Sequence, residues 1–322
     1  MTRNSLKSLT AALFAATLVL PGVALAEFPD KPITMYIGFA PGGAVDTTAR
    51  LLIENLEKEL GVPVVAVQQP GGGGAVMAAS LMNLPADGYS IGMGASAAFV
   101  LSPVYNKSLP YTMDDLDHIA TVSYPEDALV VRKDAPWNSY EDLIKDARDN
   151  KRVLTLSSQV AVSRLMAIAL EQKEGIDIDV IPTQGGGAGI QQVLGGHTDM
   201  TWGASGWHQL VQAGELKPLF SLGYKRNETF SNIPTLRELG HDYAFVDTFM
   251  LSAPKGLPAD VLERLTKAVE AALTDDLKQQ LHERMFLTAD YRNPQDTLAY
   301  LRKQQEEVMP FLEAMLAEDA KK

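Results

Sequence analysis

Cysteine is absent from the 322 residues of this chain, and its absence removes several kinds of chemistry at once. The chain can have no disulfide, no thiol nucleophile, no cysteine-ligated metal and no lipid attached to an N-terminal cysteine. HExxH is also missing, and the histidines show no metal-ligand spacing. There are five of them: His118, His197, His208, His241 and His282. We therefore expect neither a metal nor a cofactor.

Motifs of nucleotide-binding proteins and hydrolases are lacking as well. GxxxxGK[ST] does not occur, and the stretch Gly203–Trp207 lacks the second glycine of GxSxG at the required spacing. Gly92–Ala97 matches GxGxxG/A, with Asp114 downstream, but a lone match is weak evidence for a dinucleotide site. Since no nucleophile–base pair is recognisable, we expect a binding protein and not an enzyme.

Positive charge is scarce. The chain has 28 Lys and Arg against 40 Asp and Glu, which gives a net charge of −12. Such a surface repels nucleic acid and anionic membranes, so we expect no nucleic-acid partner. Backbone amides and a single cation can still form a local site for a small anion.

Long apolar runs are confined to the N-terminus. Arg3 and Lys7 precede the run Leu9–Leu20, and small residues ending at Ala26 suit a signal peptidase. The alternative, a transmembrane anchor, needs about 20 apolar residues, more than this run supplies. We expect a signal peptide over residues 1–26, cleaved near Ala26, and a periplasmic mature chain. Cleavage of the signal peptide removes two basic residues and no acidic one, which leaves the mature chain with a net charge of −14.

Glycine is concentrated in three loops. Pro41-Gly42-Gly43 follows an apolar strand that begins at Ile33 and precedes a helix expected over Asp46–Leu60. The other two loops are Pro70–Gly74 and Gln184–Gly189. A helix that starts beside such a loop offers unpaired N–H groups and the positive end of its dipole to an anion. The sequence therefore predicts that these loops surround one small anion.

Strand and helix patterns alternate in two sets, which is typical of an α/β fold with two lobes. We expect each lobe to have a mostly parallel sheet flanked by helices. Lobe 1 should comprise residues 27–126 and 250–322, and lobe 2 residues 127–249. Crossings are expected near Ser123–Ala128 and Asp247–Ser252, with a ligand in the cleft between the lobes.

Four side chains near the expected cleft have open or contrasting interpretations. Arg164, at the start of a helix, can hold a carboxylate with two parallel hydrogen bonds, or it can face solvent. Asp46 can cap its helix, or accept a hydrogen bond from a ligand amine or a water. Arg50 is interpreted as structural, paired with an acidic neighbour. His208 is the one histidine expected near the cleft.

Ordered motifs along the mature chain resemble the periplasmic solute receptors of tripartite tricarboxylate transporters, also called Bug receptors. The matching stretches are Phe28–Ile33, Pro41–Asp46 with Ala49-Arg50, Pro70–Gly74, Pro85–Tyr89, Gly195–Asp199, Ala213–Leu219, Ile233–Gly240 and Ala253–Pro258. Two stretches depart from the family pattern, Ser157–Leu165 and Pro182–Gly186. The second lacks the tyrosine and lysine that the family usually has there, whereas Arg164 is an additional cation.

The resemblance implies a type II periplasmic binding protein with two lobes, a Venus flytrap, that hands an organic acid to a membrane permease. A di- or tricarboxylate or an aromatic acid would be its ligand, and a monomer is expected. Position by position, the resemblance and the expected cleft give these ligand-binding residues: Phe39, Ala40, Gly42, Gly43, Asp46, Gly73, Gly74, Ser96, Ser158, Ser163, Arg164, Thr183, Gln184, Gly185, Gly186, Ser205, His208 and Asp247. Two alternatives are a receptor for a non-acid solute, such as an amide or an aromatic nitrogen compound, and an exported hydrolase of small anionic esters.

Overall fold

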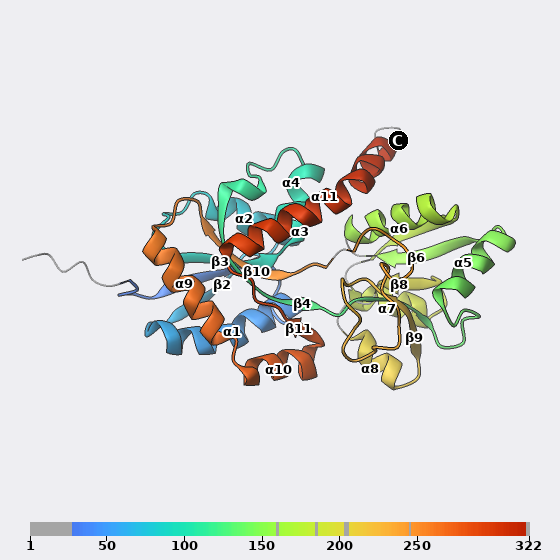
Figure 1. The fold of residues 1–322 in the computed structure, drawn as a ribbon, viewed down its shortest axis with the longest axis horizontal. Coiled ribbons are helices and arrows are strands. Elements are labelled where there is room, and N and C mark those ends of the chain that lie inside the picture. The colour runs from blue at the N-terminus through green and yellow to red at the C-terminus, as the bar shows by residue number, and fades with distance from the viewer. Residues whose placement is uncertain (1–27, 159–160, 184–185, 203–205, 245, 320–322) are drawn as a thin grey trace, which may run out of the picture.

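The chain folds into two lobes that lie side by side, each built on its own β-sheet (Figure 1). This computed structural model describes residues 28–158, 161–183, 186–202, 206–244 and 246–319. The predicted signal peptide lies outside these ranges, as do three predicted site residues: Gln184, Gly185 and Ser205.

Six strands form the sheet of the first lobe, in the order β11-β4-β10-β3-β1-β2. They are β1 (Ile33–Ile37), β2 (Val64–Gln68), β3 (Ser90–Ala95), β4 (Leu116–Pro125), β10 (Phe249–Pro254) and β11 (Leu287–Ala289). β1 pairs in parallel with β2 and β3, whereas β10 runs antiparallel to β3 and β4, and β11 runs antiparallel to β4. The two-lobe α/β fold is confirmed, but this sheet is mixed and not mostly parallel, because the chain leaves the lobe through β4 and returns through β10.

Helices cover this sheet. The longer ones are α1 (Ala44–Leu60), α9 (Ala259–Ala272), α10 (Asp275–Met285) and α11 (Pro294–Asp319). The short ones are η1 (Gly72–Gly74), α2 (Ala75–Leu81), α3 (Ala97–Val100), α4 (Ser102–Tyr105) and η2 (Met113–Asp115). α1 ends at Gly61, as its sequence predicts, and Gly61 is left-handed with φ 75°. Its apolar stripe, which includes Leu52 and Leu56, packs into one core with β1 and α9.

The second lobe has a five-stranded sheet in the order β7-β6-β8-β5-β9. Its strands are β5 (Ala128–Arg132), β6 (Val153–Ser158), β7 (Asp177–Pro182), β8 (Met200–Trp202) and β9 (Leu216–Ser221), and its helices are α5 (Tyr140–Asp149), α6 (Ala161–Glu174), α7 (Gly186–Leu194) and α8 (Trp207–Gln212). β6 pairs in parallel with β7 and β8, whereas β5 runs antiparallel to β8 and β9. This sheet is therefore mixed too. Ser139 caps α5, since its hydroxyl accepts a hydrogen bond from the N–H of Asp142.

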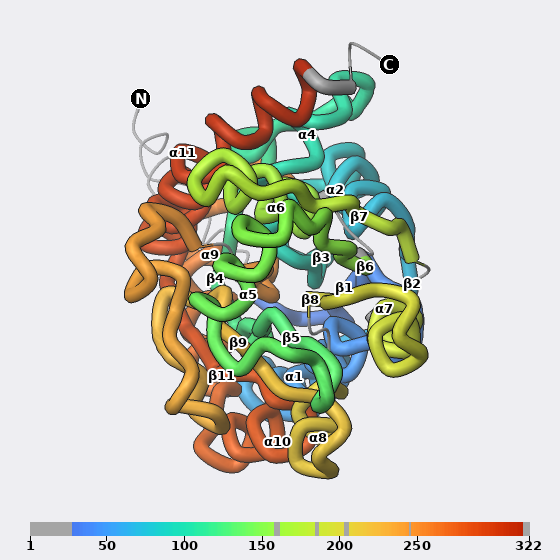
Figure 2. Tube along the Cα trace, turned by 90° about the vertical axis from the view of Figure 1, so that its right-hand side faces the viewer, coloured from blue at the N-terminus to red at the C-terminus, as the bar shows by residue number. Residues whose placement is uncertain are grey.

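Two segments join the sheets. Only Glu126 and Asp127 separate β4 from β5, and the other connection reaches the first sheet at the start of β10. The lobe limits expected from the sequence stay a prediction. α11, however, extends across to α6 of the other lobe (Figures 1 and 2). Near its end, the Phe311 ring lies 4.8 Å from the ring of Tyr243, edge to face. The last turns of α11 therefore pack against the second lobe.

Within the described ranges, none of the helices combines the length and the apolar composition that a membrane crossing requires.

Candidate ligand-binding site

The carboxyl ends of β1, β2 and β3 bring the predicted first-lobe residues together. These strands are parallel neighbours, so the loops that follow them lie at the same edge of the sheet. Gly74 is tightly placed there: a Cβ atom on it would lie 3.4 Å from the Phe39 ring and 3.3 Å from the Cβ of Ala98. α1 begins at the same edge, and its N-cap, Gly43, has no side chain to occupy the N–H groups of the first turn.

The side chain of Asp46 supports the glycine loop at this edge of the sheet. Its carboxylate accepts a hydrogen bond of 2.8 Å from the N–H of Gly42, others from Arg50 at 3.0 and 3.1 Å, and one from the side-chain amide of Gln68. The residue is only 3 % exposed. Burial acts to raise the pKa of Asp46, but the hydrogen bonds from Arg50, Gly42 and Gln68 outweigh it and lower the pKa. The predicted pairing of Arg50 is confirmed, and Asp46 bonds to the loop that surrounds the site.

Ser96 and Asp247 connect β3 to the second crossing. The Ser96 hydroxyl accepts a hydrogen bond of 3.1 Å from the N–H of Thr248, and Ser96 is fully buried. The Asp247 carboxylate accepts a hydrogen bond of 2.9 Å from the N–H of Ala97. Ser96 therefore positions the backbone of the second crossing at Thr248. Asp247 is half-buried, so it is the member of the pair that solvent reaches.

In the second lobe, hydroxyl groups gather at the carboxyl ends of β6, β7 and β8. Ser157 donates a hydrogen bond of 3.0 Å to the carbonyl of Gly189 in α7, and Thr201 donates one of 3.0 Å to the carbonyl of Ser157. A Cβ atom on Gly189 would lie 2.9 Å from Oγ1 of Thr201 and 3.6 Å from Oγ1 of Thr183. Of these residues only Thr183 was predicted, because buried hydroxyls inside strands look like ordinary strand residues in a sequence.

The other predicted residues of this lobe lie on the helices that follow the strands or on the strand ends. Ser163 is buried and Arg164 is half-buried, both in the first turn of α6. Ser158 ends β6 and Gly186 begins α7. His208 is in the first turn of α8, and its ring stacks on Phe286 at a centroid distance of 4.1 Å.

Asp127 on the first crossing was not predicted. Burial raises the pKa of Asp127 to about 7, and the negative charge of Asp247 acts in the same direction. Burial also raises the pKa of Asp247 to about 6, against the hydrogen bonds from Ala97 and Ser96. Both residues are partly exposed, yet the surrounding protein removes enough water to favour their neutral forms. The two crossings thus carry an acidic pair whose members repel each other when both are ionised.

In both lobes, the strand ends that carry the predicted residues lie against these crossings. Ala95, at the carboxyl end of β3, pairs with Phe249 at the start of β10, two residues after Asp247. Trp202, at the carboxyl end of β8, pairs with Leu129, two residues after Asp127. Strand register therefore places both sets of strand ends at the junction of the lobes.

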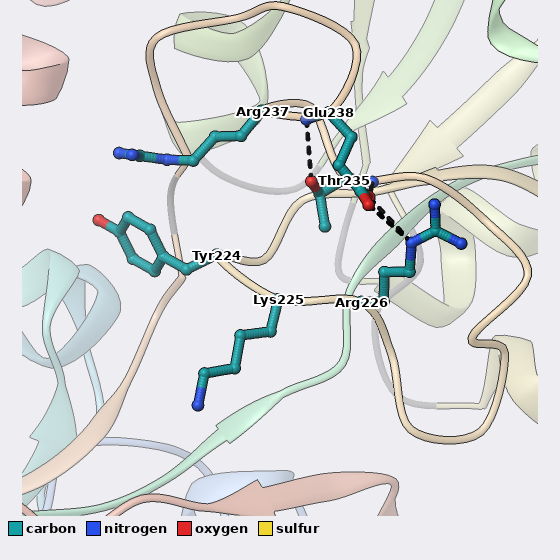
Figure 3. A pocket seen from close by; sticks show the side chains of 6 residues that line it. All are labelled: Tyr224, Lys225, Arg226, Thr235, Arg237 and Glu238. Carbon is teal, nitrogen blue, oxygen red and sulfur yellow. Dashed lines mark hydrogen bonds and ion pairs between the residues drawn. The ribbon is translucent and has the colours of Figure 1, made fainter.

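A hollow of about 330 Å³ lies on the second lobe, lined by Tyr224, Lys225, Arg226, Thr235, Arg237 and Glu238 (Figure 3). None of the predicted residues is among these six. Arg226 is paired with Glu238 at 2.9 Å, and Arg237 with Glu307 of α11 at 2.5 Å. Because both guanidinium groups already have carboxylate partners, this hollow is a poor candidate for the main anion site.

Comparison with known proteins gives consistent matches over most of the chain. The sequence profile of the tripartite tricarboxylate transporter family receptors matches residues 48–315. A UPF0065 protein in the gbd 5' region of Cupriavidus necator is 33% identical over 281 residues, which is 84% of this chain and 83% of the relative. Protein BugT of Bordetella pertussis is 28% identical over 269 residues, 81% of this chain and 82% of its own.

Solved structures share the fold. A solute-binding protein of the TctC type from Polaromonas has a TM-score of 0.77 at 24% identity, covering 89% of this chain and 99% of its own. MatC from Rhodopseudomonas palustris, solved with malate, has a TM-score of 0.73 at 22% identity, over 88% and 100% of the two chains. A second R. palustris protein, solved with adipate, has a TM-score of 0.73 at 24% identity, over 89% and 98%.

Proposed function

The chain belongs to the tripartite tricarboxylate transporter receptor family, and we propose that it binds a small organic carboxylate between its lobes and delivers it to a membrane permease. The resemblance inferred from the ordered motifs is confirmed, and family members are periplasmic receptors. The proposed ligand is a di- or tricarboxylate or an aromatic acid, and the protein acts without catalysing a reaction.

The observation that carries this proposal is the convergence of two sets of strand ends on the lobe junction. In the first lobe, the uncapped N-terminus of α1 lies beside the glycine loops, which is a favourable seat for a carboxylate. In the second lobe, the ends of β6, β7 and β8 carry hydroxyls and lead into α6, α7 and α8. Malate and adipate in proteins of the same fold support an acid ligand.

The proposed site has two parts that recognise a ligand differently. The first-lobe loops offer backbone N–H groups, which bind any carboxylate of suitable size. The second-lobe residues, Ser158, Ser163, Arg164, Thr183 and Gly186, belong to the stretches that depart from the family pattern. We assign general anion binding to the first part and the choice of acid to the second.

A thermal-shift panel tests the function. It contains mono-, di- and tricarboxylates, aromatic acids, amino acids and the matching neutral amides. A ligand at 100 times its Kd should raise the free energy of unfolding by about 2.7 kcal/mol. At least one acid is expected to stabilise the protein while its amide does not. Stabilisation by neutral solutes alone would favour the non-acid receptor, and consumption of the best ligand would favour the hydrolase.

Arg164 gives a sharper test within the site. Replacing Arg164 with alanine should weaken the acid by about 1.5–3 kcal/mol, or roughly 10- to 150-fold, because a charge-assisted hydrogen bond is lost. Calorimetric titration measures the change, and Lys173→Ala, an exposed cation on the same helix, is the control. Equal affinity of the two variants for the acid would mean that Arg164 does not bind the ligand and has only a structural role.

A further inference from the structure

His208 is an unusual buried histidine. It is 2 % exposed, and neither ring nitrogen has a hydrogen-bond partner among the described residues. Its ring lies between Phe286, at 4.1 Å, and Trp207, at 3.8 Å. A buried imidazole with two unpaired nitrogens costs free energy unless something satisfies it. Nε2 points to Glu126, whose Oε2 atom is 3.9 Å away.

Three further groups converge beside it. One ligand atom each from Glu126, Glu228 and His282 lie within 4.8 Å of one another. Nδ1 of His282 is also without a hydrogen-bond partner in the described part of the chain, and it is 3.8 Å from Oε2 of Glu228. The His208–Glu126 distance of 3.9 Å and the His282–Glu228 distance of 3.8 Å both exceed the length of a hydrogen bond. They are about 0.5–0.6 Å longer than the roughly 3.3 Å that separates two ligands of a tetrahedral Zn²⁺ with bonds of about 2.05 Å.

We propose that Glu126, Glu228, His282 and His208 form a zinc site at the junction of the lobes. Two imidazole nitrogens and two carboxylate oxygens are a donor set that suits Zn²⁺. The proposal does not depend on the carboxylate ligand, which would sit at the strand ends. It also differs from our expectation from the sequence, which was that the chain has no metal site.

Neighbouring groups already orient the central carboxylate. Oε1 of Glu126 accepts hydrogen bonds from the N–H of Glu228, at 2.9 Å, and from the Thr288 hydroxyl, at 3.0 Å. Oε2 has one long contact, 3.4 Å from the N–H of Thr229, and faces His208. One oxygen is therefore anchored and the other is available to an ion, which is how supporting groups commonly position a metal ligand.

The site has an entry path and a structural consequence. The side chains of Glu228 and His282 are 64 % and 36 % exposed, so an ion can reach the cluster from solvent. His282 is on α10 of the first lobe, His208 is on α8 of the second, and Glu126 is on the crossing between them (Figure 1). A bound ion would link both lobes on one side of the junction.

Titration calorimetry with ZnCl₂ tests the site, on untagged full-length mature protein that has been stripped with EDTA. We expect saturation at one ion per chain. Glu228→Gln and His282→Ala should each weaken it by at least about 100-fold, since loss of supporting groups alone costs 10- to 100-fold. The matched controls are Glu283→Gln and His197→Ala. Glu283 is an acid on α10, next to His282, and His197 is an exposed histidine elsewhere on the surface.

Co²⁺ provides a second readout. Its visible absorption should be that of a four-coordinate ion in the wild type and should be lost in His282→Ala. Absence of stoichiometric Zn²⁺ binding would overturn the proposal, as would equal effects in the variants and their controls. His208→Phe, compared with the wild type only after its circular dichroism shows a folded chain, should abolish the same spectrum.

Discussion

Replacing Asp46 with alanine should lower the free energy of unfolding by about 3 kcal/mol, even with no ligand present. The substitution leaves the N–H of Gly42 and the amide of Gln68 without an acceptor, and Arg50 without its partner. Removal of one member of a buried ion pair costs about 3–5 kcal/mol, and the half-exposed Arg50 places this case at the lower end. Urea unfolding measures the loss.

Arg50→Ala is the matched control for that experiment. Arg50 is 53 % exposed, so its removal should cost less than about 1 kcal/mol. The pair of variants also separates two roles for Asp46. If Asp46→Ala lost ligand affinity but kept its full unfolding free energy, the carboxylate would be a direct ligand group, and the loop-supporting role argued from its contacts would be incorrect.

Asp127→Asn should stabilise the protein at high pH and do so less as the pH falls. The folded-state pKa of Asp127 is raised from 3.8 to about 7. The stability contributed by its neutral form is therefore complete below about pH 4 and is lost as the pH rises through about 7. Asparagine resembles the neutral carboxyl at every pH. At 1.36 kcal/mol per pKa unit, less some screening by solvent, the advantage at about pH 8 should be roughly 2–4 kcal/mol.

Urea unfolding at about pH 5 and about pH 8 measures this effect, and comparison between variant and wild type removes the contribution of other titrating groups. Asp242→Asn changes an exposed acid of the second lobe and serves as the control. A stability difference for Asp127→Asn that stayed constant between the two pH values would contradict the assigned pKa shift.

Local patterns predicted much of the first lobe. β1, the glycine loop and α1 are adjacent in sequence, and each has an ordinary local signal: an apolar strand, glycine before the helix and an apolar stripe ending at Gly61. The pairing of Arg50 with Asp46 follows from the same helix periodicity. These features needed no information about distant parts of the chain.

The remainder depends on contacts between distant segments. β10 pairs with β3 and β4 although more than a hundred residues separate them in sequence, so its antiparallel direction had no local signal. α10 and β11 were not predicted either, since α10 is largely polar and β11 has only three residues. The sheets were consequently expected to be mostly parallel, and they are mixed.

The acidic pair and the proposed zinc ligands show the same limit. Asp127 is an ordinary acid in the sequence, and only the fold reveals that burial, with the charge of Asp247 nearby, raises its pKa. His208, Glu228 and His282 lie on three separate segments and have no motif spacing. The absence of cysteine, of HExxH and of metal-ligand spacing led to the expectation of no metal, whereas the fold brings Glu228 and His282 close to Glu126 and places His208 beside Glu126.

Calorimetric titration with the best acid of the panel, beside its uncharged amide, tests the central claim most directly. The account predicts saturable binding of one acid per chain, amide binding weaker by at least about 10-fold, and recovery of the acid unchanged after the titration. Equal affinity for acid and amide would contradict a carboxylate receptor, and conversion of the acid during the titration would contradict a receptor of any kind.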